Sequence, residues 1–336
     1  MPATSTVTVT VPATTANLGP GFDCIGAALS LYNSFQFSLI EPPATEKLKV
    51  TVTGAEAAKV KTDDSNLAYQ AFVKLYQYLR QPPPPVTIHI DMQVPLARGL
   101  GSSATAIVGG LVAANCLAGK PLSQVDVMQL AIELEGHPDN VVPALLGGCR
   151  LAASNTPPQP PLSKGGLREE SPLTPPLNKG GQGGVSWQIC DIPWHSNIVP
   201  VVAIPDFELS TAEARKVLPN DYTKADAIFN AAHVGLLVRA LETGNENWLR
   251  AALQDKIHQP YRQSLIRGYE AVQEAALNAG ACGMVISGAG PTLLALTDVT
   301  NADLVVREMA AAWMEFGVKA DVRAIAIDTQ GAQVST

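Results

Sequence analysis

The stretch of the chain best suited to chemistry is a glycine- and serine-rich segment in its first third. Residues 95–106 read PLARGLGSSATA, so two glycines and two serines stand directly before an alanine-rich apolar run. The run from Ala104 to Ala118 has the pattern of a helix, and glycines let a backbone come close to a ligand. A loop that leads into a helix N-terminus offers free N–H groups and the positive end of the helix dipole. The segment therefore predicts an anion site, for phosphate above all.

Two better-known phosphate motifs fit this segment poorly. It matches the dinucleotide pattern G-x-G-x-x-A, but that fold needs an acidic residue at the end of a second strand about 20 residues later. Residues 121–134 instead continue in a helical pattern. The Walker pattern G-x-x-x-x-G-K-[ST] is absent, because the Gly-Lys pair at 119–120 is followed by proline. We therefore expect a phosphate loop of another type.

Two further stretches place polar side chains among apolar neighbours. In residues 12–26, PATTANLGPGFDCIG, Asn17 and Asp23 flank a Gly-Pro-Gly turn. Residues 133–140, ELEGHPDN, crowd two glutamates, a histidine, an aspartate and an asparagine at the end of a predicted helix, just before an apolar run. Polar groups beside a core need partners, and carboxylates suit Mg²⁺ or a substrate ammonium group. We expect both stretches to serve a site, although a plain turn and a solvated helix end are the simpler explanations.

The elements that must position these residues alternate between strand and helix. Strict alternation predicts strands at residues 6–11, 48–54 and 86–94, and helical spacing predicts a helix over 65–79. In the second half the pattern predicts two strands followed by helices over 224–243 and 262–279. Two strands around a glycine-rich turn, a capped helix from Asn301 and a last strand over 318–328 are expected after them. This order indicates an α+β fold.

Residues 155–184 differ in kind from the rest of the chain. They are rich in proline and glycine, and PPLSKGG recurs there as PPLNKGG. Such a segment is too poor in apolar residues to offset its ordering entropy, which predicts a disordered insertion; a docking segment for a partner is the alternative. The chain of 336 residues also exceeds the length at which one core usually divides. We therefore predict an N-terminal domain over 1–154 and a C-terminal domain over 185–336.

Composition excludes several classes of function. A net charge of −7 argues against a nucleic-acid or anionic-membrane surface, and the run 104–119 is too short to cross a bilayer. The five cysteines show no Cys-x-x-Cys spacing, which indicates free thiols in a reducing compartment. The first residues lack the basic and apolar regions of a secretory signal. We expect a cytoplasmic protein that acts on a small polar substrate.

Four motifs taken together resemble the GHMP small-molecule kinases. They are NLGPGFD (17–23), GLGSSA (99–104), EGHPDN (135–140) and SGAGPT (287–292), and the match spans nearly the whole chain outside the insertion. Mevalonate-type members pair a lysine near the first strand with an aspartate in Pro-Ser-Gly-x-Asp, and galactokinases carry their own signature. This chain has neither feature. The resemblance therefore implies the branch that uses Mg²⁺ and ATP to phosphorylate the side-chain hydroxyl of L-homoserine, a step toward threonine, and it implies a homodimer.

The resemblance also assigns residues to the nucleotide and the metal. Asn66 matches the position that touches the nucleoside, and a helix cap near Ser65 is the alternative. Ser103 and a helix carboxylate are expected to reach Mg²⁺, and Glu133 is preferred over Glu135. The backbone expected to wrap the ATP phosphates comprises Pro95, Leu96, Ala97, Arg98, Gly99, Leu100, Gly101, Ser102, Ser103, Ala104 and Thr105.

A second set of residues is assigned to the amino-acid substrate. Two arginines would clamp its α-carboxylate in a planar, bidentate way, although Ser210 and Glu213 could mark a mere capping box beside them. Phosphoryl transfer has a loose transition state and needs no strong base, so Asp23 and Asn140 are expected to orient the acceptor while Glu133 binds the metal. His233 and His258 are expected to be packed or solvated. The assigned substrate residues are Asn17, Asp23, His137, Asp139, Asn140, Thr211, Arg215 and Arg262.

The fold that the resemblance implies is α+β with two domains. The N-terminal α/β domain would contain a left-handed β-α-β crossover, against the usual rule, and the C-terminal domain would be ferredoxin-like. The active site would lie between them, and the turn at 287–292 would either pack near it or form a plain hairpin. Two alternatives stay open: a GHMP kinase for another small alcohol, and a non-catalytic amino-acid or nucleotide sensor on the same fold.

Overall fold

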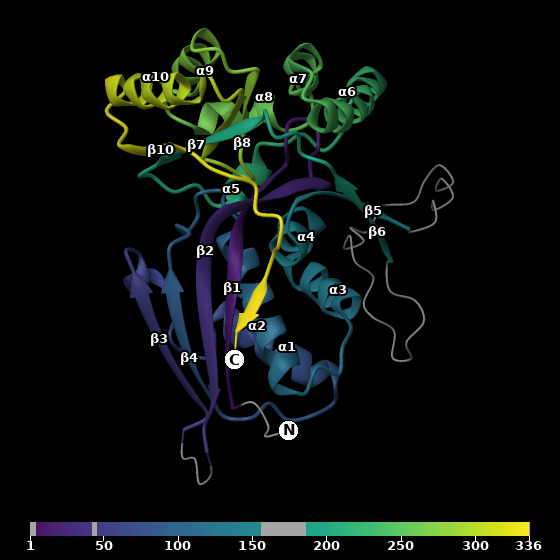
Figure 1. Cartoon of the computed structure of the whole chain (residues 1–336), viewed down its shortest axis with the longest axis vertical. Helices are drawn as coiled ribbons and strands as arrows, with labels where there is room; N and C mark the ends of the chain where they lie inside the picture. Colours follow the sequence, from purple (N-terminus) through teal and green to yellow (C-terminus); the bar gives the residue numbers. More distant parts are fainter. Residues whose placement is uncertain (1–4, 42–45, 156–185, 336) are drawn as a thin grey trace.

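The computed structural model describes residues 5–41, 46–155 and 186–335, so nearly all of the predicted insertion lies outside the described residues. The first part of the chain (Figure 1) forms β1 (Thr6–Ala16), β2 (Ile25–Leu39), β3 (Leu48–Gly54), α1 (Leu67–Tyr78), β4 (Val86–Met92), α2 (Ser102–Leu117), α3 (Gln124–Glu135), α4 (Pro138–Leu146), β5 (Cys149–Ser154) and β6 (Trp187–Ile192). The second part forms β7 (Val199–Pro205), α5 (Thr211–Lys216), α6 (Lys224–Thr243), α7 (Glu246–Ala252), α8 (Gln259–Arg262), α9 (Tyr269–Asn278), β8 (Gly283–Ile286), β9 (Leu293–Thr297), α10 (Ala302–Glu315), β10 (Ala320–Ala324) and β11 (Gln333–Ser335).

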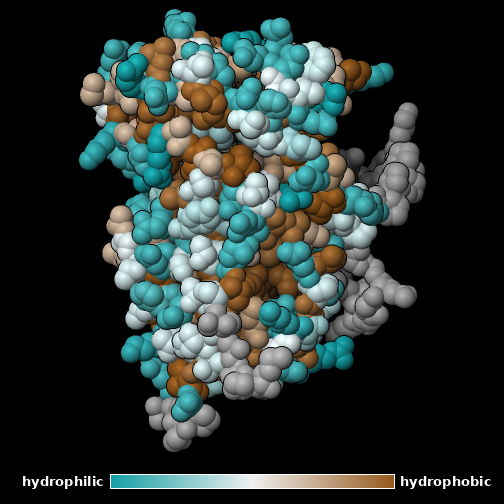
Figure 2. Space-filling view, in the orientation of Figure 1, coloured by the Kyte–Doolittle hydropathy of each residue, from teal (hydrophilic) through white to brown (hydrophobic). Residues whose placement is uncertain are grey.

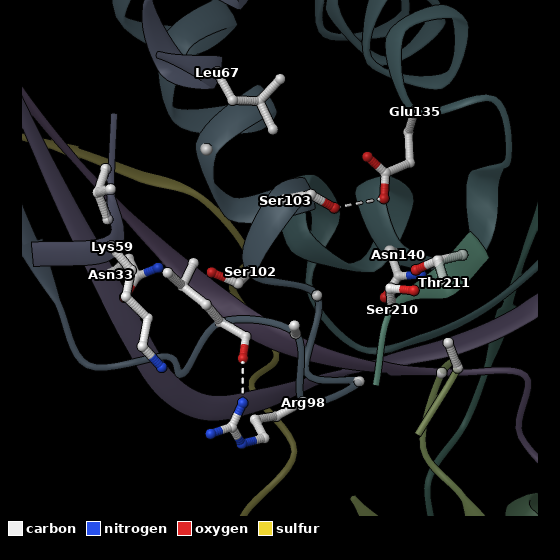
Figure 3. Close-up of a pocket in the computed structure, with 18 of the residues that line it drawn as sticks. Asn33, Lys59, Leu67, Arg98, Ser102, Ser103, Glu135, Asn140, Ser210 and Thr211 are labelled. Carbon is white, nitrogen blue, oxygen red and sulfur yellow. Dashed lines mark hydrogen bonds between the residues drawn. The ribbon is translucent and has the colours of Figure 1, made fainter. Parts of the chain in front are cut away.

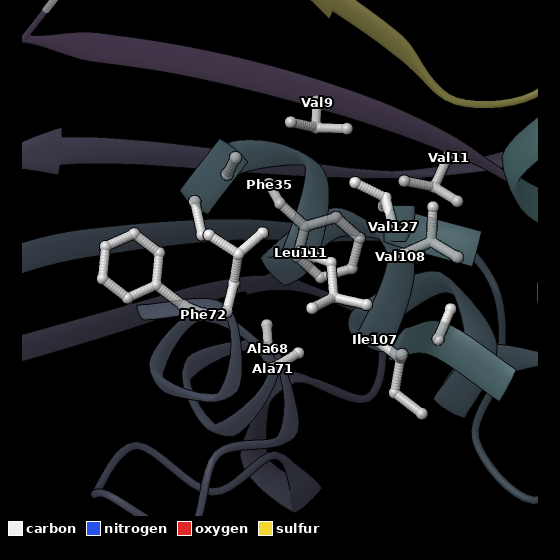
Figure 4. Close-up of a cluster of buried hydrophobic side chains, with 14 of the residues drawn as sticks. Val9, Val11, Phe35, Ala68, Ala71, Phe72, Ile107, Val108, Leu111 and Val127 are labelled. Carbon is white, nitrogen blue, oxygen red and sulfur yellow. The ribbon is translucent and has the colours of Figure 1, made fainter. Parts of the chain in front are cut away.

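The first sheet is organised around the long strand β2. Its order is β11-β1-β2-β4-β3, while β5 pairs with β2 and β6 pairs with β5. β3 and β4 are parallel neighbours joined through α1, which is the predicted β-α-β crossover; its hand stays a prediction. The alternating valines of β1 point into a core with Phe35 of β2, Phe72 of α1 and Leu111 of α2 (Figure 4). This core fixes α2, and with it the glycine-rich segment, against the sheet.

The second sheet has the order β10-β7-β9-β8 with all pairs antiparallel. With α5 to α8 inserted between β7 and α9, the chain runs β7, α9, β8, β9, α10, β10, so the sheet order is 4-1-3-2 for a β-α-β-β-α-β unit. This is the expected ferredoxin-like arrangement. Its α9 and α10 cover one face around buried Trp313. Helices α6 and α7 pack with residues of β7, β9 and the adjoining ends of β1 and β2 in a further core, which joins the two parts of the chain.

Four details differ from the sequence-based expectations. The strand β2, the longest in the described residues, was not predicted. The predicted helix over 262–279 is interrupted, because α9 begins only after Gly268, which has a positive φ. Asn301 does not cap α10 with its side chain, which donates to Asp298 instead. Beyond β10 the chain returns to the first sheet as β11. β6 and β11 therefore pair with the N-terminal sheet although both lie after residue 185.

Hydrophilic and neutral residues cover most of the face seen in Figure 2, and hydrophobic residues reach the surface mainly in its middle. None of the helices in the described residues has the length and apolar composition needed to span a membrane.

Candidate active site

A cavity of about 500 Å³ opens at the N-terminus of α2, between the two sheets. Its walls come from residues 96–99 and 101–103, from the ends of α3 and α4, from α5, and from the turn at 288–290. Four segments far apart in the sequence thus meet at one place, and each of the four family-like motifs contributes to it. The turn at 287–292 is therefore more than a plain hairpin.

The N-terminus of α2 is left open toward this cavity. Gly101 is the N-cap with φ 66°, and no side chain of the described residues caps the helix. The first N–H groups of a helix have no acceptor within it, so those at the start of α2 are free to bind an anion. Gly99 (φ 75°) and Gly101 are also required by the protein itself, since a Cβ would lie 2.2 Å from the Ser287 carbonyl oxygen or 1.9 Å from Thr14 Oγ1.

The other residues of the predicted phosphate segment divide into two groups. Leu96, Ala97, Ser102 and Ser103 line the cavity. The Arg98 guanidinium also borders it but donates to the carbonyl oxygens of Leu96, Pro205 and Asp206, each at 2.9 Å, so its side chain ties the loop to the C-terminal part. The remaining residues do not line the cavity, and all but Pro95 are buried: Pro95, Leu100, Ala104 and Thr105.

The two candidate metal-binding glutamates point in different directions. Ser103 Oγ donates to Glu135 Oε1 at 2.8 Å, and Figure 3 shows these side chains turned toward one another from α2 and α3. Burial raises the pKa of Glu135. Glu133 Oε1 instead accepts from Lys74 Nζ of α1 at 2.7 Å, and Glu133 does not line the cavity. The structure thus places Glu135, and not Glu133, beside Ser103.

The far end of the cavity is apolar, and sequence reasoning missed it. Phe35, Leu67, Ile90 and Met92 line it together with Val60. They come from β2, α1, β4 and the turn before α1, so no local motif could have revealed them. The flat, apolar ring of a nucleoside base would fit this end of the cavity.

Asn66 sits at this apolar end and serves as the N-cap of α1. Its Oδ1 accepts from the N–H groups of Ala68 and Tyr69, and its Nδ2 donates to the Lys61 carbonyl oxygen at 2.7 Å. The helix-cap alternative is therefore correct, while Asn66 also borders the cavity.

Two arginines meet around Phe22 at the opposite end of the cavity. Arg215 forms a bidentate pair with Asp23, at 2.8 and 3.1 Å. Arg262 is 1% exposed and donates to the carbonyl oxygens of Ala214 and Gly288, but it forms no salt bridge with a carboxylate of the described residues. Burial and the nearby charge of Arg215 together lower the pKa of Arg262 to about 10. The Arg262 guanidinium therefore stays charged at neutral pH. A buried cation without an anionic partner favours an anionic ligand.

The polar cluster at the start of α4 lies next to these arginines. Potential ligand atoms of Asp23, His137 and Asp139 all lie within 4.8 Å of one another. His137 Nδ1 is 2.6 Å from Asp139 Oδ1. Burial opposes protonation of His137. The hydrogen bond to Asp139 and the neighbouring carboxylates outweigh the effect of burial, so the pKa of His137 is raised. Asp139 Oδ2 is buried without a hydrogen-bond partner among the described residues. The cluster therefore suits a cationic group.

The remaining predicted residues also gather here. Asn17 has φ 57°; its Oδ1 accepts from the Asp23 N–H and its Nδ2 donates to the Gly288 carbonyl oxygen, so it shapes the turn as well as the cavity wall. Thr211 and Asn140 line the cavity, and Ser210 with Glu213 forms the capping box of α5. His258 is fully buried, 2.8 Å from the Gly19 carbonyl oxygen, and His233 is half-buried against Phe229. Both histidines are packed.

Comparison with known proteins agrees with this geometry. The family model for the GHMP kinases N terminal domain matches residues 66–148, and that for the GHMP kinases C terminal domain matches residues 237–314. The chain is 63% identical to the homoserine kinase of Trichormus variabilis over 99% of this chain and 100% of that protein. The chain belongs to the homoserine kinase family of the GHMP kinases.

Further members of the family and its wider relatives support the fold over the full length. A homoserine kinase of Trichodesmium erythraeum is 61% identical over 100% of both chains. The crystal structure of homoserine kinase from Cytophaga hutchinsonii superposes with a TM-score of 0.82 at 27% identity and covers 100% of this chain and 99% of that one. L. major mevalonate kinase, at 16% identity and a TM-score of 0.65 over 95% of both chains, shares the fold.

Proposed function

We propose that this protein transfers the γ-phosphoryl group of ATP to the side-chain hydroxyl of L-homoserine, giving ADP and O-phospho-L-homoserine. The observation that carries the proposal is a single cavity that joins a helix N-terminus without a side-chain cap to a buried arginine that has no ion-pair partner among the described residues. The first feature suits a phosphate chain and the second suits a carboxylate. A substrate with both an α-carboxylate and a hydroxyl fits between them.

The amino-acid end of the substrate would bind among the arginines and the α4 cluster. Arg262 would receive the α-carboxylate, together with Arg215 once that residue turns from Asp23. The α-ammonium group would then satisfy Asp23 and Oδ2 of Asp139, which has no hydrogen-bond partner in the described part of the chain. A zwitterion can replace the Arg215–Asp23 pair because it supplies both missing charges. This arrangement favours α-amino acids over hydroxy acids such as mevalonate, which have a carboxylate but no ammonium group to pair with Asp23 and Asp139.

The reacting end would lie at the start of α2. Backbone N–H groups there would hold the phosphates, and Asn140 would orient the acceptor hydroxyl in front of them. Fixed donors that face the charge of the transferring group account for most of the acceleration in such reactions. No general base is assigned, since the transition state is loose and the hydroxyl proton can leave late.

The donor set beside the phosphate site fits a magnesium ion. Ser103 Oγ and Glu135 Oε1 are hard oxygen atoms 2.8 Å apart at the edge of the loop, and Mg²⁺ is commonly held by one or two such side chains together with phosphates and water. When bound, the ion would neutralise charge on the phosphates. We propose Ser103 and Glu135 as its protein ligands.

The substrate assignment is tested by measuring ADP release with Mg·ATP and a panel of acceptors. L-Homoserine should give turnover well above L-threonine, L-serine and mevalonate, and ³¹P NMR should identify the product as a phosphate monoester of homoserine. Turnover with mevalonate alone would contradict the proposal. Nucleotide and amino-acid binding without turnover would favour a sensor.

Replacing Arg215 by alanine should raise the KM for L-homoserine by about 10- to 100-fold, because a bidentate charged contact is lost. The KM for ATP should change by less than about threefold, since the phosphates bind elsewhere. Lys216→Ala is the matched control, as this neighbour on α5 is exposed. With 3-aminopropan-1-ol, which lacks the carboxylate, Arg215→Ala should make little difference. An unchanged KM for homoserine would remove Arg215 from the pocket.

We further propose, from the family resemblance, that the enzyme is a homodimer in the cytoplasm and does not act on nucleic acid or membranes. Light scattering of the purified protein should give twice the chain mass.

A further inference from the structure

A fully buried threonine lies directly behind Asn140. Thr14 is 0% exposed, and its Oγ1 lies 2.8 Å from Asn140 Oδ1. Thr14 belongs to β1 and Asn140 to the first turn of α4, 126 positions later in the chain. Asn140 is also one of the residues that line the cavity. One face of Asn140 therefore meets a buried hydroxyl, while the other faces the space where acceptor and phosphate would meet.

The neighbours of Asn140 determine which way its amide points. Asn140 Nδ2 lies 3.4 Å from Asp139 Oδ1, where an N–H can donate weakly to the carboxylate. The reversed amide would place its carbonyl oxygen 3.4 Å from that carboxylate oxygen, and two acceptors would then face one another. The hydroxyl of Thr14 therefore donates to Oδ1. The second N–H of Asn140 is left for the cavity.

Thr14 is also bound to the phosphate loop. Its backbone N–H donates to the Leu100 carbonyl oxygen at 3.1 Å. Its hydroxyl occupies the space beside Gly101, where a Cβ would lie 1.9 Å from Thr14 Oγ1 and 3.1 Å from Asn140 Oδ1. One residue of β1 thus contacts both the loop that precedes α2 and the neighbouring amide of Asn140.

We propose that Thr14 is a positioning residue, whose hydroxyl holds the Asn140 carbonyl so that the amide presents an N–H donor to the acceptor oxygen or the transferring phosphoryl group. The expected effect on turnover rests on the proposed function, whereas the Thr14–Asn140 contact does not depend on that function. If the hydroxyl is removed, Oδ1 loses its buried partner and the amide can rotate. The N–H donor would then be displaced from the acceptor oxygen or the transferring phosphoryl group.

The test compares Thr14→Val, which keeps the shape of the side chain but removes the hydroxyl, with Thr14→Ser, which keeps the hydroxyl. Thr14→Val should lower kcat by about 10- to 100-fold, as expected for a misplaced orienting group, with both KM values within about threefold. Thr14→Ser should retain kcat within about threefold. Thr297→Val is the matched control, because this buried hydroxyl has no partner among the described residues and lies away from the site. It should leave kcat unchanged.

A double-mutant cycle separates positioning from a general loss of structure. In the Asn140→Ala background, Thr14→Val should change kcat by less than about twofold, since the group through which it acts is gone. The Tm shifts of the two substitutions should likewise be non-additive, whether or not the protein acts on homoserine. If the wild type fails to turn over homoserine, the proposed function fails while the Tm cycle still tests the contact. Additive effects in both cycles, or equal kcat for the valine and serine variants, would overturn the inference. Should Thr14→Val be insoluble, Thr14→Ala against Thr14→Ser carries the same comparison.

Discussion

Replacing Glu135 by glutamine should lower kcat by about 100- to 1,000-fold, the loss typical of removing one preorganised group that faces transition-state charge. Glutamine keeps the size of the side chain, and its amide can still contact Ser103, so the change removes only the negative charge. The neutral side chain binds a hard divalent cation weakly. Activity measured against the magnesium concentration should therefore also reach its half-maximum at a higher concentration than in the wild type.

Glu133→Gln provides the control, since the two glutamates lie two residues apart on α3. Its carboxylate contacts Lys74 rather than Ser103, at a distance of 2.7 Å. A partly exposed pair of this kind contributes about 0–1 kcal/mol to stability. Glu133→Gln should therefore keep kcat within about twofold of the wild type and leave the magnesium dependence unchanged. The opposite pattern would restore Glu133 as the metal ligand.

Replacing Gly101 by alanine should reduce kcat at least about 100-fold and lower the free energy of unfolding by about 2–4 kcal/mol, the combined cost of backbone strain and overpacking. Gly101 has φ 66°, which disfavours alanine, and the new Cβ would lie 1.9 Å from Thr14 Oγ1. Relief of that overlap requires the start of α2 to move away from β1. Movement there displaces the N–H groups proposed to hold the phosphates.

The substitution Gly119→Ala separates the effect of backbone strain from that of overpacking. Gly119 also has a positive φ, of 84°, but a Cβ added there would have no atom within 4 Å. It follows the other end of α2, so the substitution adds backbone strain alone and should cost about 1 kcal/mol with activity retained. Chemical denaturation and steady-state kinetics on both variants measure the difference. Equal effects on kcat would mean that the close approach at Gly101 has no part in the site.

Sequence reasoning succeeded where the signal was local. The glycines before an alanine-rich run indicated an open helix N-terminus, and α6 has the predicted bounds, Lys224–Thr243. The capping box at Ser210 and Glu213 was equally readable, because its partners are three residues apart. The break before α9 could have been predicted as well, since Gly268 stands in the middle of the expected helix.

Sequence reasoning failed where the outcome depends on distant packing. β2 is buried on both faces along its first residues, which therefore lack the alternation that marks a strand, whereas its second half, residues 33–39, does alternate and was overlooked. β11 has only three residues, all exposed, and is defined by its pairing with β1. Glu133 and Glu135 are about 200° apart around one helix, and only the position of α3 against α1 and α2 shows which of them faces Ser103. The apolar end of the cavity likewise exists only once β2, β4 and α1 have packed.

The central claim is that phosphate binds at the start of α2 while the amino acid binds at Arg262, so that the two reacting groups meet in front of Asn140. A crystal structure with magnesium, a non-hydrolysable ATP analogue and L-homoserine tests it most directly. We expect the terminal phosphate within hydrogen-bonding distance of the first N–H groups of α2, and the substrate carboxylate on the Arg262 guanidinium. Nucleotide bound elsewhere, with the helix N-terminus covered by protein side chains, would contradict the account.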